Sequence, residues 1–291
     1  MAHAVGIDIG GTNLKAGVVS ETEGLVKLLQ EPTSRSRETQ LIEQITTIVE
    51  KFRKEYTLKG VGVGIAGLVN HRKGTIVTSP HLPVKQTPLK KILEERLDIP
   101  VLVDNDVNAS GLGERFFGAG KDALEFIYLT IGTGIGGAIF INGELYRGTT
   151  GFAGELGHMI VDLNGPLCDC NAQGCLEAIA SGTALERISG HRGEEVTALA
   201  KSGNRRCVEA LKFIGKNLGV GIANAINIFD PELVILGGKV VKAGKFLLDS
   251  ANEEIRRRTL GYNYRNVRVE ISPLGDRAGP LGAASMILHN V

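Results

Sequence analysis

Apolar residues in this chain alternate between short continuous runs and sets at helical spacing. Runs rich in valine, isoleucine and leucine predict strands at 4–11, 14–20, 60–69 and 99–106. Between them, helical spacing predicts one helix over about 37–55 and a second through Leu89, Leu93 and Leu97. Strands followed by alternating helices and strands are typical of an α/β layer fold.

The same pattern starts again near the middle of the chain. Residues 125–148 predict a strand, a glycine-rich turn and a second strand, which is the order found at 4–20. A long helix through Leu211 and Ile222 and a strand at 232–238 follow. This weak internal repeat predicts two halves whose glycine turns face one cleft.

Two segments stand outside the repeat. Residues 277–289 predict a helix that packs back on the first half, and residues 149–182 are irregular. Because 291 residues are many for one hydrophobic core, we expect two domains. The smaller domain would hold 1–109 plus 276–291, and the larger would hold 110–275.

Net charge, the length of the apolar runs and the glycine content add to this picture. A formal net charge of +1 gives no electrostatic reason to expect nucleic acid or acidic lipid as a partner. No apolar run approaches the roughly 20 residues that span a bilayer, and no charged leader precedes the first strand, so we expect a cytoplasmic protein. Glycine is more frequent than in an average protein, with 39 residues in the chain. The glycines cluster at strand ends, where the backbone must approach another group closely.

The first glycine turn, DIGGTNLK at 8–15, carries groups suited to phosphate. Gly10 and Gly11 can present backbone N–H groups to phosphate oxygens, Thr12 adds a hydroxyl, and Asp8 offers a carboxylate for a hydrated Mg²⁺. A plain β-hairpin turn with a capping aspartate is the alternative. The second turn, IGTGIGG, stands at the equivalent point of the other half and favours a nucleoside triphosphate held between two domains.

A cluster of cysteines lies in the irregular segment. Cys168, Cys170 and Cys175 have the form C-x-C-x₄-C, and His158 offers a fourth ligand. Thiolate and imidazole in a set of four favour a closed, structural Zn²⁺ site. The alternative is a disulfide in one pair, which leaves one thiol over and is disfavoured in the cytosol. We expect Cys207 to be an ordinary buried thiol.

Several motifs together carry a resemblance. D-x-G-G-T near the start, a second G-T-G turn and a late LVILGG resemble the sugar kinase/actin/Hsp70 ATPase superfamily. GTGIGGAIFINGELYRGTTGFAGELGH, VDNDVNA and the cysteine cluster resemble the ROK family, which includes bacterial glucokinases, other hexose kinases and sugar-responsive repressors. The resemblance runs from about residue 4 to 288. It implies two RNase H-like (actin-like ATPase) domains around a central nucleotide and sugar cleft.

The resemblance also implies roles for the acidic strand end VDNDVNA. Asp106 would accept the proton of the attacking sugar hydroxyl, and Asn105 would orient that hydroxyl. The alternative is that Asp106 only caps the helix starting near Asn108. Asp104 faces the other way on an extended strand, and we expect it to be structural.

The remaining contacts follow from the same resemblance. Glu155, His158 and Glu177 would hydrogen-bond the sugar, with Gly67 beside them. The expected ATP site comprises Asp8, Gly10, Gly11, Thr12, Lys15, Gly132, Thr133, Gly134, Gly237 and Gly238. For the last two, a strand that simply ends in a glycine turn is the alternative.

Three positions depart from the family pattern. Asn171 stands where glycine is common after the second cysteine, and asparagine tolerates the left-handed conformation that such a turn needs. His81-Leu82-Pro83 stands for N-L-P, and Ala66 replaces a proline-containing form. We expect these changes to leave the phosphate turns unaffected and to loosen any inference about the preferred sugar.

The sequence therefore predicts an ATP:hexose 6-phosphotransferase, glucokinase-like, that uses Mg²⁺-ATP and holds a structural Zn²⁺. The resemblance implies a homodimer or higher homo-oligomer. Alternatives are a kinase for fructose, mannose or an N-acetylhexosamine, with polyphosphate as another donor. A non-enzymatic sugar sensor is less favoured, because the family's repressors carry an N-terminal helix-turn-helix and DIGGT begins here at residue 8.

Overall fold

The structure is a computed structural model that describes residues 3–291. The chain divides into two compact units. The first contains the residues up to Ala123, Ala138–Ala153 and the residues from Ser272 onward, and the second contains Leu124–Gly137 and Gly154–Ile271. The boundary expected after residue 109 falls inside the helix α3 (Asp106–Phe117). Because a continuous helix packs as one body, α3 belongs wholly to the first unit.

A five-stranded sheet forms the centre of the first unit, in the order β3-β2-β1-β4-β8. Its strands are β1 (His3–Ile9), β2 (Asn13–Ser20), β3 (Gly24–Pro32), β4 (Leu58–Ile65) and β8 (Val101–Asn105). β1, β2 and β3 are antiparallel, whereas β1, β4 and β8 run parallel. All were predicted except β3, an edge strand in which half-buried and exposed residues alternate.

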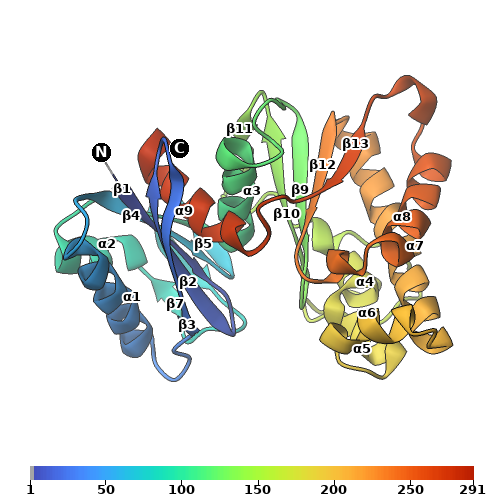
Figure 1. Ribbon diagram of the computed structural model, residues 1–291, viewed down its shortest axis with the longest axis horizontal. Helices are drawn as coiled ribbons and strands as arrows, with labels where there is room; N and C mark the ends of the chain where they lie inside the picture. Colours follow the sequence, from blue (N-terminus) through green and yellow to red (C-terminus); the bar gives the residue numbers. More distant parts are fainter. Residues whose placement is uncertain (1–2) are drawn as a thin grey trace. The chain divides into compact units, whose positions relative to one another are not determined.

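Helices cover both faces of this sheet (Figure 1). On one face, α1 (Glu38–Arg53) and α2 (Leu89–Leu97) bury their apolar stripes against the strand side chains. On the other face lies α9 (Ala278–His289). A Cβ at Gly6 would lie 1.8 Å from the carbonyl oxygen of Pro280, and one at Gly62 would lie 1.7 Å from that of Ala283. The C-terminal helix therefore packs directly on the first sheet, as predicted, and only glycine allows this approach.

Two smaller features complete the first unit. A three-stranded sheet follows β4 and contains β5 (Leu68–Asn70), β6 (Thr75–Thr78) and β7 (Lys85–Thr87). These strands are too short for a periodic signal, and the sequence did not predict β6 or β7. α3 starts directly after β8 and lies against α9. The carboxyl end of β8 is thus fixed between the small sheet and these two helices.

The second sheet has the order β11-β10-β9-β12-β13. Its strands are β9 (Phe126–Ile131), β10 (Ile135–Ile141), β11 (Glu144–Leu145), β12 (Leu233–Gly237) and β13 (Arg268–Ile271). In each sheet the first strand of the half is central, the next two lie to one side, and the later strands add in parallel on the other side. This shared order confirms the internal repeat. The division between the units falls within β10, at Ala138.

Five α-helices lie in the described residues of the second unit. They are α4 (Leu176–Ala180), α5 (Gly182–Ser189), α6 (Gly193–Lys201), α7 (Arg205–Phe229) and α8 (Lys245–Arg258). Short 3₁₀ turns are η1 (Leu156–His158), η2 (Val240–Ala243) and η3 (Tyr262–Tyr264), with η4 (Gly275–Arg277) in the first unit. α7 is the predicted long helix, and its apolar stripe from Leu211 to Ile222 is fully buried.

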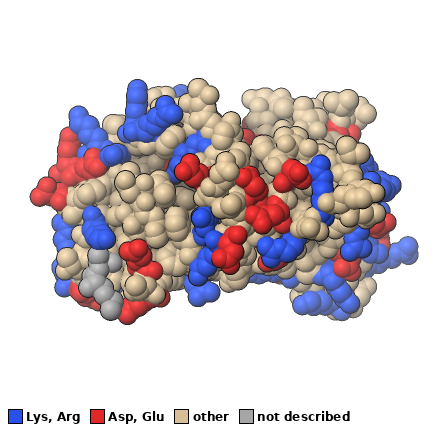
Figure 2. Space-filling model, turned by 90° about the horizontal axis from the view of Figure 1, so that it is seen from above, with Lys and Arg blue, Asp and Glu red and all other residues tan. Residues whose placement is uncertain are grey.

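The surface fits the near-neutral composition. In the view of Figure 2, acidic and basic side chains are interspersed, and neither sign forms a continuous field on that face. Over residues 3–291, none of the helices is both long enough and apolar enough to span a bilayer.

Candidate functional site

The junction of β8 and α3 carries the acidic motif VDNDVNA. Asn105 is the N-cap of α3, because its Oδ1 accepts hydrogen bonds from the backbone N–H groups of Val107 (2.8 Å) and Asn108 (3.2 Å). Its Nδ2 donates to the carbonyl oxygen of Gly67 at 3.1 Å. Asp106 is the first helical residue, so the alternative in which Asp106 caps α3 is wrong. Asparagine and aspartate are both favoured caps, and the sequence could not decide between neighbours.

The side chain of Asp104 is held by three groups. Its Oδ1 accepts from the backbone N–H of Asn105 (2.7 Å) and from Nδ2 of Asn108 (3.0 Å). Its Oδ2 accepts from Nε of Arg147 at 2.7 Å, in an ion pair whose Asp104 side chain is 2% exposed. The structural role expected for Asp104 agrees with these contacts. No local pattern in the sequence marked Arg147, its partner from a distant loop.

The first glycine turn connects β1 to β2. The backbone N–H of Gly10 donates to the carbonyl oxygen of Asn13 (3.1 Å), and Thr33 Oγ1 donates to the carbonyl oxygen of Gly10 (2.8 Å). The expectation that Gly10 offers its N–H to phosphate is therefore wrong in this conformation, since that N–H closes the turn. The prediction of a phosphate cradle now rests on the N–H groups of Gly11 and Thr12.

His81 borders this first turn. A Cβ at Gly11 would lie 2.9 Å from the Cβ of His81. We expected the unusual segment His81-Leu82-Pro83 to leave the phosphate turns unaffected, but its first residue lies directly beside one. Any ligand phosphate at Gly11 would meet the backbone of a turn that His81 packs against.

Asp8 stands at the end of β1 beside a second carboxylate. The pKa of Asp8 is raised to about 7, mainly by burial and then by the negative charge of Asp106, while the charge of Lys15 opposes both. Lys15 itself lies opposite Asp8 in the β1–β2 ladder and pairs with Asp276 at 3.0 Å. Asp276 also raises the pKa of Asp8, and the sequence reasoning missed it. Clustered carboxylates that disfavour one another's charge suit a divalent cation with oxygen ligands.

The second glycine turn, residues 132–134, is clamped by the segment that follows the cysteines. Glu177 Oε2 accepts from the backbone N–H of Ile135 at 2.8 Å. The N–H of Gly182 donates to the carbonyl oxygen of Gly132 at 2.8 Å, and Thr183 Oγ1 donates to that of Thr133 at 2.9 Å. Glu177 was predicted to bind sugar, and its contact with the glycine turn is an additional finding.

The predicted sugar residues of the second unit lie close together. η1 places His158 one turn after Glu155, with His158 Nε2 at 3.8 Å from Glu155 Oε2. Burial raises the pKa of Glu155, His158 lowers it, and the charge of Glu177 raises it. The three side chains therefore share one electrostatic environment, as the expected sugar site requires. Their contact with a sugar stays a prediction.

The cysteine cluster brings together the four predicted metal ligands. One donor atom from each of His158, Cys168, Cys170 and Cys175 lies within 4.8 Å of the others. Cys168 Sγ is 3.7 Å from His158 Nδ1, and Cys170 Sγ is 3.6 Å from Cys175 Sγ. All four cysteines among residues 3–291 are free thiols. His158 thus turns Nδ1 to the thiols and Nε2 to Glu155.

The donor chemistry fits a closed zinc site. Burial and the neighbouring thiols raise the pKa of Cys175 to about 12, so its thiolate is disfavoured unless a metal binds and stabilises it. Between the first two cysteines and the third, Asn171 has the left-handed φ of 68°, as expected from its place in the family pattern. Three thiols and one imidazole are a tetrahedral Zn²⁺ set with no position left for water.

The strand end expected to bind adenosine has a structural reason for its glycines. Gly238 has a φ of 90°, and a Cβ there would lie 2.2 Å from the carbonyl oxygen of Ile131. A Cβ at Gly237 would lie 2.2 Å from Tyr128 Oη. Close approach to β9 therefore accounts for both glycines, and their contact with a nucleotide stays a prediction.

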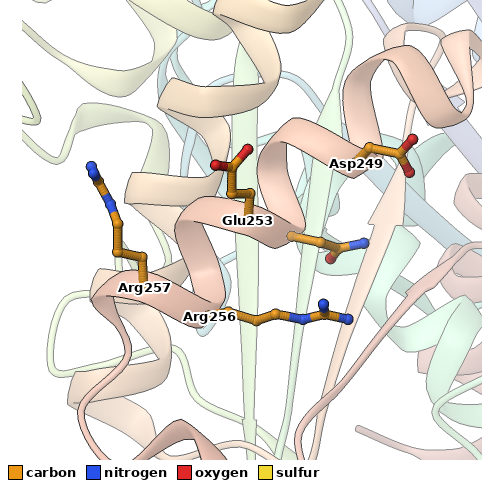
Figure 3. A pocket seen from close by; sticks show the side chains of 5 residues that line it. Asp249, Glu253, Arg256 and Arg257 are labelled. Atoms are coloured by element: carbon orange, nitrogen blue, oxygen red, sulfur yellow. The ribbon is translucent and has the colours of Figure 1, made fainter.

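One hollow of the second unit lies apart from these residues. It has a volume of about 540 Å³ and is lined by Asp249, Asn252, Glu253, Arg256 and Arg257. Figure 3 shows these side chains leaving one helix, α8, in different directions, so they do not converge on a common point. None of the predicted site residues lines it.

Comparison with known proteins places this chain in a family. The ROK family matches residues 4–290. The glucokinase of Streptomyces coelicolor is 35% identical over 310 residues, covering 98% of each chain. The xylose repressor of Bacillus subtilis is 32% identical over 299 residues, covering 99% of this chain and 77% of the repressor.

Solved structures agree with this placement. A ROK family glucokinase from Streptomyces griseus, in complex with glucose and AMPPNP, matches with a TM-score of 0.88 at 33% identity over 98% of each chain. The ROK hexokinase of Thermus thermophilus matches with a TM-score of 0.86 at 33% identity, covering 97% of this chain and 96% of that one. The chain therefore belongs to the ROK family and has the actin-like ATPase fold of its sugar kinases.

Proposed function

We propose that this protein is an ATP-dependent hexose kinase that phosphorylates the 6-hydroxyl, with glucose as the first substrate to test. One observation carries the proposal. Asn105 caps α3, which places Asp106 as the first helical residue at the carboxyl end of β8, where its charge raises the pKa of Asp8. A general base and a candidate magnesium ligand thus stand side by side. The full-length similarity to glucokinases supports the choice of reaction.

In this reaction the sugar oxygen attacks the γ-phosphorus of Mg²⁺-ATP. A new O–P bond forms, the bond to the bridging oxygen breaks, ADP leaves, and the hydroxyl proton passes to Asp106. Asp8 binds the hydrated Mg²⁺ of the substrate, and Lys15 and the N–H groups of Gly11 and Thr12 receive the phosphates. Phosphoryl transfer depends mainly on positioning and electrostatic stabilisation, so fixed turns suit it.

The second unit supplies the sugar contacts in this proposal. Glu155 and Glu177 accept hydrogen bonds from sugar hydroxyls, and His158 donates from Nε2. That tautomer follows if Nδ1 binds a Zn²⁺ held with Cys168, Cys170 and Cys175. The metal would serve only to hold the loop in shape. Gly132, Thr133 and Gly134 complete the phosphate site, with the adenosine at Gly237 and Gly238.

A coupled ADP-release assay tests the proposal. Glucose, mannose, fructose, N-acetylglucosamine and N-acetylmannosamine would be compared with Mg²⁺-ATP as donor. We expect turnover with glucose, and a fall in kcat of about 100- to 10,000-fold in Asp106→Asn, because the base is lost. Asp98→Asn is the matched control: Asp98 follows α2 with a left-handed φ of 52°, which asparagine also adopts.

The outcomes separate the alternatives. Preference for another sugar would keep the kinase reaction and replace glucose. The xylose repressor relatives favour a second candidate, a sugar sensor. Sugar binding in calorimetry without sugar-stimulated ADP release would support that candidate and overturn the kinase proposal.

A further inference from the structure

Arg147 joins a loop of the first unit to the strand that ends at the proposed base. It follows β11, its side chain is 17% exposed, and its Nε donates to Asp104 Oδ2 at 2.7 Å. Asp104 is 2% exposed, so its charge has little access to water. A buried carboxylate requires a partner in fixed geometry, and Arg147 provides it.

The two oxygens of Asp104 face different neighbours. Oδ2 receives Arg147, whereas Oδ1 receives the backbone N–H of Asn105 (2.7 Å) and Nδ2 of Asn108 (3.0 Å). One rigid carboxylate group therefore connects the loop to the first turn of α3. Asn105 caps this turn, and Asp106 is its first residue.

The loop that carries Arg147 is itself anchored. The backbone N–H of Ala153 donates to the carbonyl oxygen of Arg147 at 3.2 Å. A Cβ at Gly151 would lie 3.0 Å from His71 Nδ1 and 3.1 Å from the carbonyl oxygen of Val69, so the loop lies directly on β5 and the turn after it. Arg147 thus holds Asp104 from a fixed support.

We propose that Arg147 is a positioning residue for phosphoryl transfer, which acts through Asp104 and Asn105 to fix the place of Asp106. The inference rests on the proposed kinase function. A base must stand within hydrogen-bond reach of its hydroxyl, and a displacement of about 1 Å can lower the rate about 100-fold. Loss of the connection should therefore lower kcat more than it changes either KM.

The test compares two double variants of equal charge. In Asp104→Asn with Arg147→Gln, Gln Oε1 occupies the place of Arg Nε and can accept from Asn Nδ2, so the connection remains with its direction reversed. In Asp104→Asn with Arg147→Met, the connection is absent. Both keep an oxygen for Asn105 and Asn108. Arg115→Met is the control, because Arg115 lies on α3 and donates to the carbonyl oxygens of Gly143 and Lys121.

We expect the Asn–Met variant to lower kcat about 10- to 100-fold with both KM values within about threefold of wild type. The Asn–Gln variant should recover at least a third of wild-type kcat, and Arg115→Met should retain it. Melting temperatures identify variants that lose activity by unfolding. Arg147→Lys, which keeps the charge, provides a third folded comparison and should be intermediate.

Three results would overturn the inference. The first is an unchanged kcat in the Asn–Met variant. The second is an equal loss of kcat in the two double variants, which would show that the charge matters and the connection does not. The third is a wild-type protein that phosphorylates no sugar, in which case the proposed function fails first and this inference fails with it.

Discussion

The two glycine turns occupy equivalent places in two sheets of the same strand order, but they are held differently. The first turn closes on itself through Gly10 and Asn13, and its neighbours Asp8, Asp106 and Asp276 are carboxylates that disfavour one another's charge. The second turn is clamped from outside by residues 177–183. The two halves thus share one strand order but differ around their turns, with clustered carboxylates in the first unit and a hydrogen-bonded clamp in the second.

The largest test of this division is Asp8→Asn. We expect kcat to fall at least about 100-fold, because the amide cannot replace a carboxylate as ligand of Mg²⁺-ATP. Removal of a strained charge should at the same time stabilise the folded protein. Steady-state kinetics and thermal unfolding without Mg²⁺ measure the two effects.

The pH dependence of that stability has a defined sign. The pKa of Asp8 is raised from 3.8 to about 7, so the folded state binds its proton more tightly than the unfolded state. Ionisation of Asp8 therefore lowers the free energy of unfolding progressively as pH rises from about 4 to 7. Above that range the destabilisation has its full value. Asp8→Asn should therefore gain several degrees of Tm at pH 8 and little at pH 4. A gain that is equal at both pH values would contradict the assignment.

A smaller effect is expected from breaking the clamp at the cysteine cluster. Cys175 is fully buried, is the N-cap of α4 and precedes Glu177, which holds Ile135. We expect the Cys175→Ala protein to bind no zinc and to bind AMPPNP about 10-fold more weakly. Its affinity for sugar should also fall. Metal analysis and calorimetry measure both quantities.

Cys207→Ala is the control for that experiment, because Cys207 is equally buried but lies in α7, outside the cluster. It should keep its zinc and its nucleotide affinity. Unchanged AMPPNP affinity in a zinc-free Cys175→Ala protein would show that the clamp does not depend on the metal.

The smallest expected effect belongs to Thr183→Val. The substitution removes the hydrogen bond from Oγ1 to the carbonyl oxygen of Thr133, while the backbone bond from Gly182 to Gly132 remains. A single neutral hydrogen bond contributes about 1 kcal/mol, so the KM for ATP should rise about two- to fivefold with sugar KM unchanged. A change confined to the sugar KM would contradict the assignment of the second glycine turn to the phosphate site.

The sequence predicted the sheets and long helices because their apolar residues follow clear periods. It missed β3, whose half-buried and exposed positions alternate without a matching alternation of apolar and polar residues, as well as β13 and the short strands of the small sheet. The cluster of four candidate metal ligands was predictable because the spacing of three cysteines is local. The hydrogen-bond partners of backbone groups were not predictable, and the bond from the Gly10 N–H to the carbonyl oxygen of Asn13 was therefore missed.

The remaining partners in the site could not be predicted because they lie far apart along the chain. Arg147 meets Asp104 across 43 positions, and Asp276 acts on Asp8 from the far end of the chain. No local pattern marks such pairs, because each residue alone resembles an ordinary surface charge. The choice between Asn105 and Asp106 as N-cap depended on one position, which is finer than any helix period defines.

The packing of α9 affects the order in which the two units can fold during synthesis. This helix seals the face of the first sheet, and a Cβ at its Gly279 would lie 2.5 Å from the carboxyl carbon of Asp8. Yet α9 follows every residue of the second unit in the chain. During synthesis on the ribosome, the second unit can therefore fold while one face of the first sheet is still uncovered. The acidic site can therefore become buried only after the chain has supplied the cysteine cluster and α9.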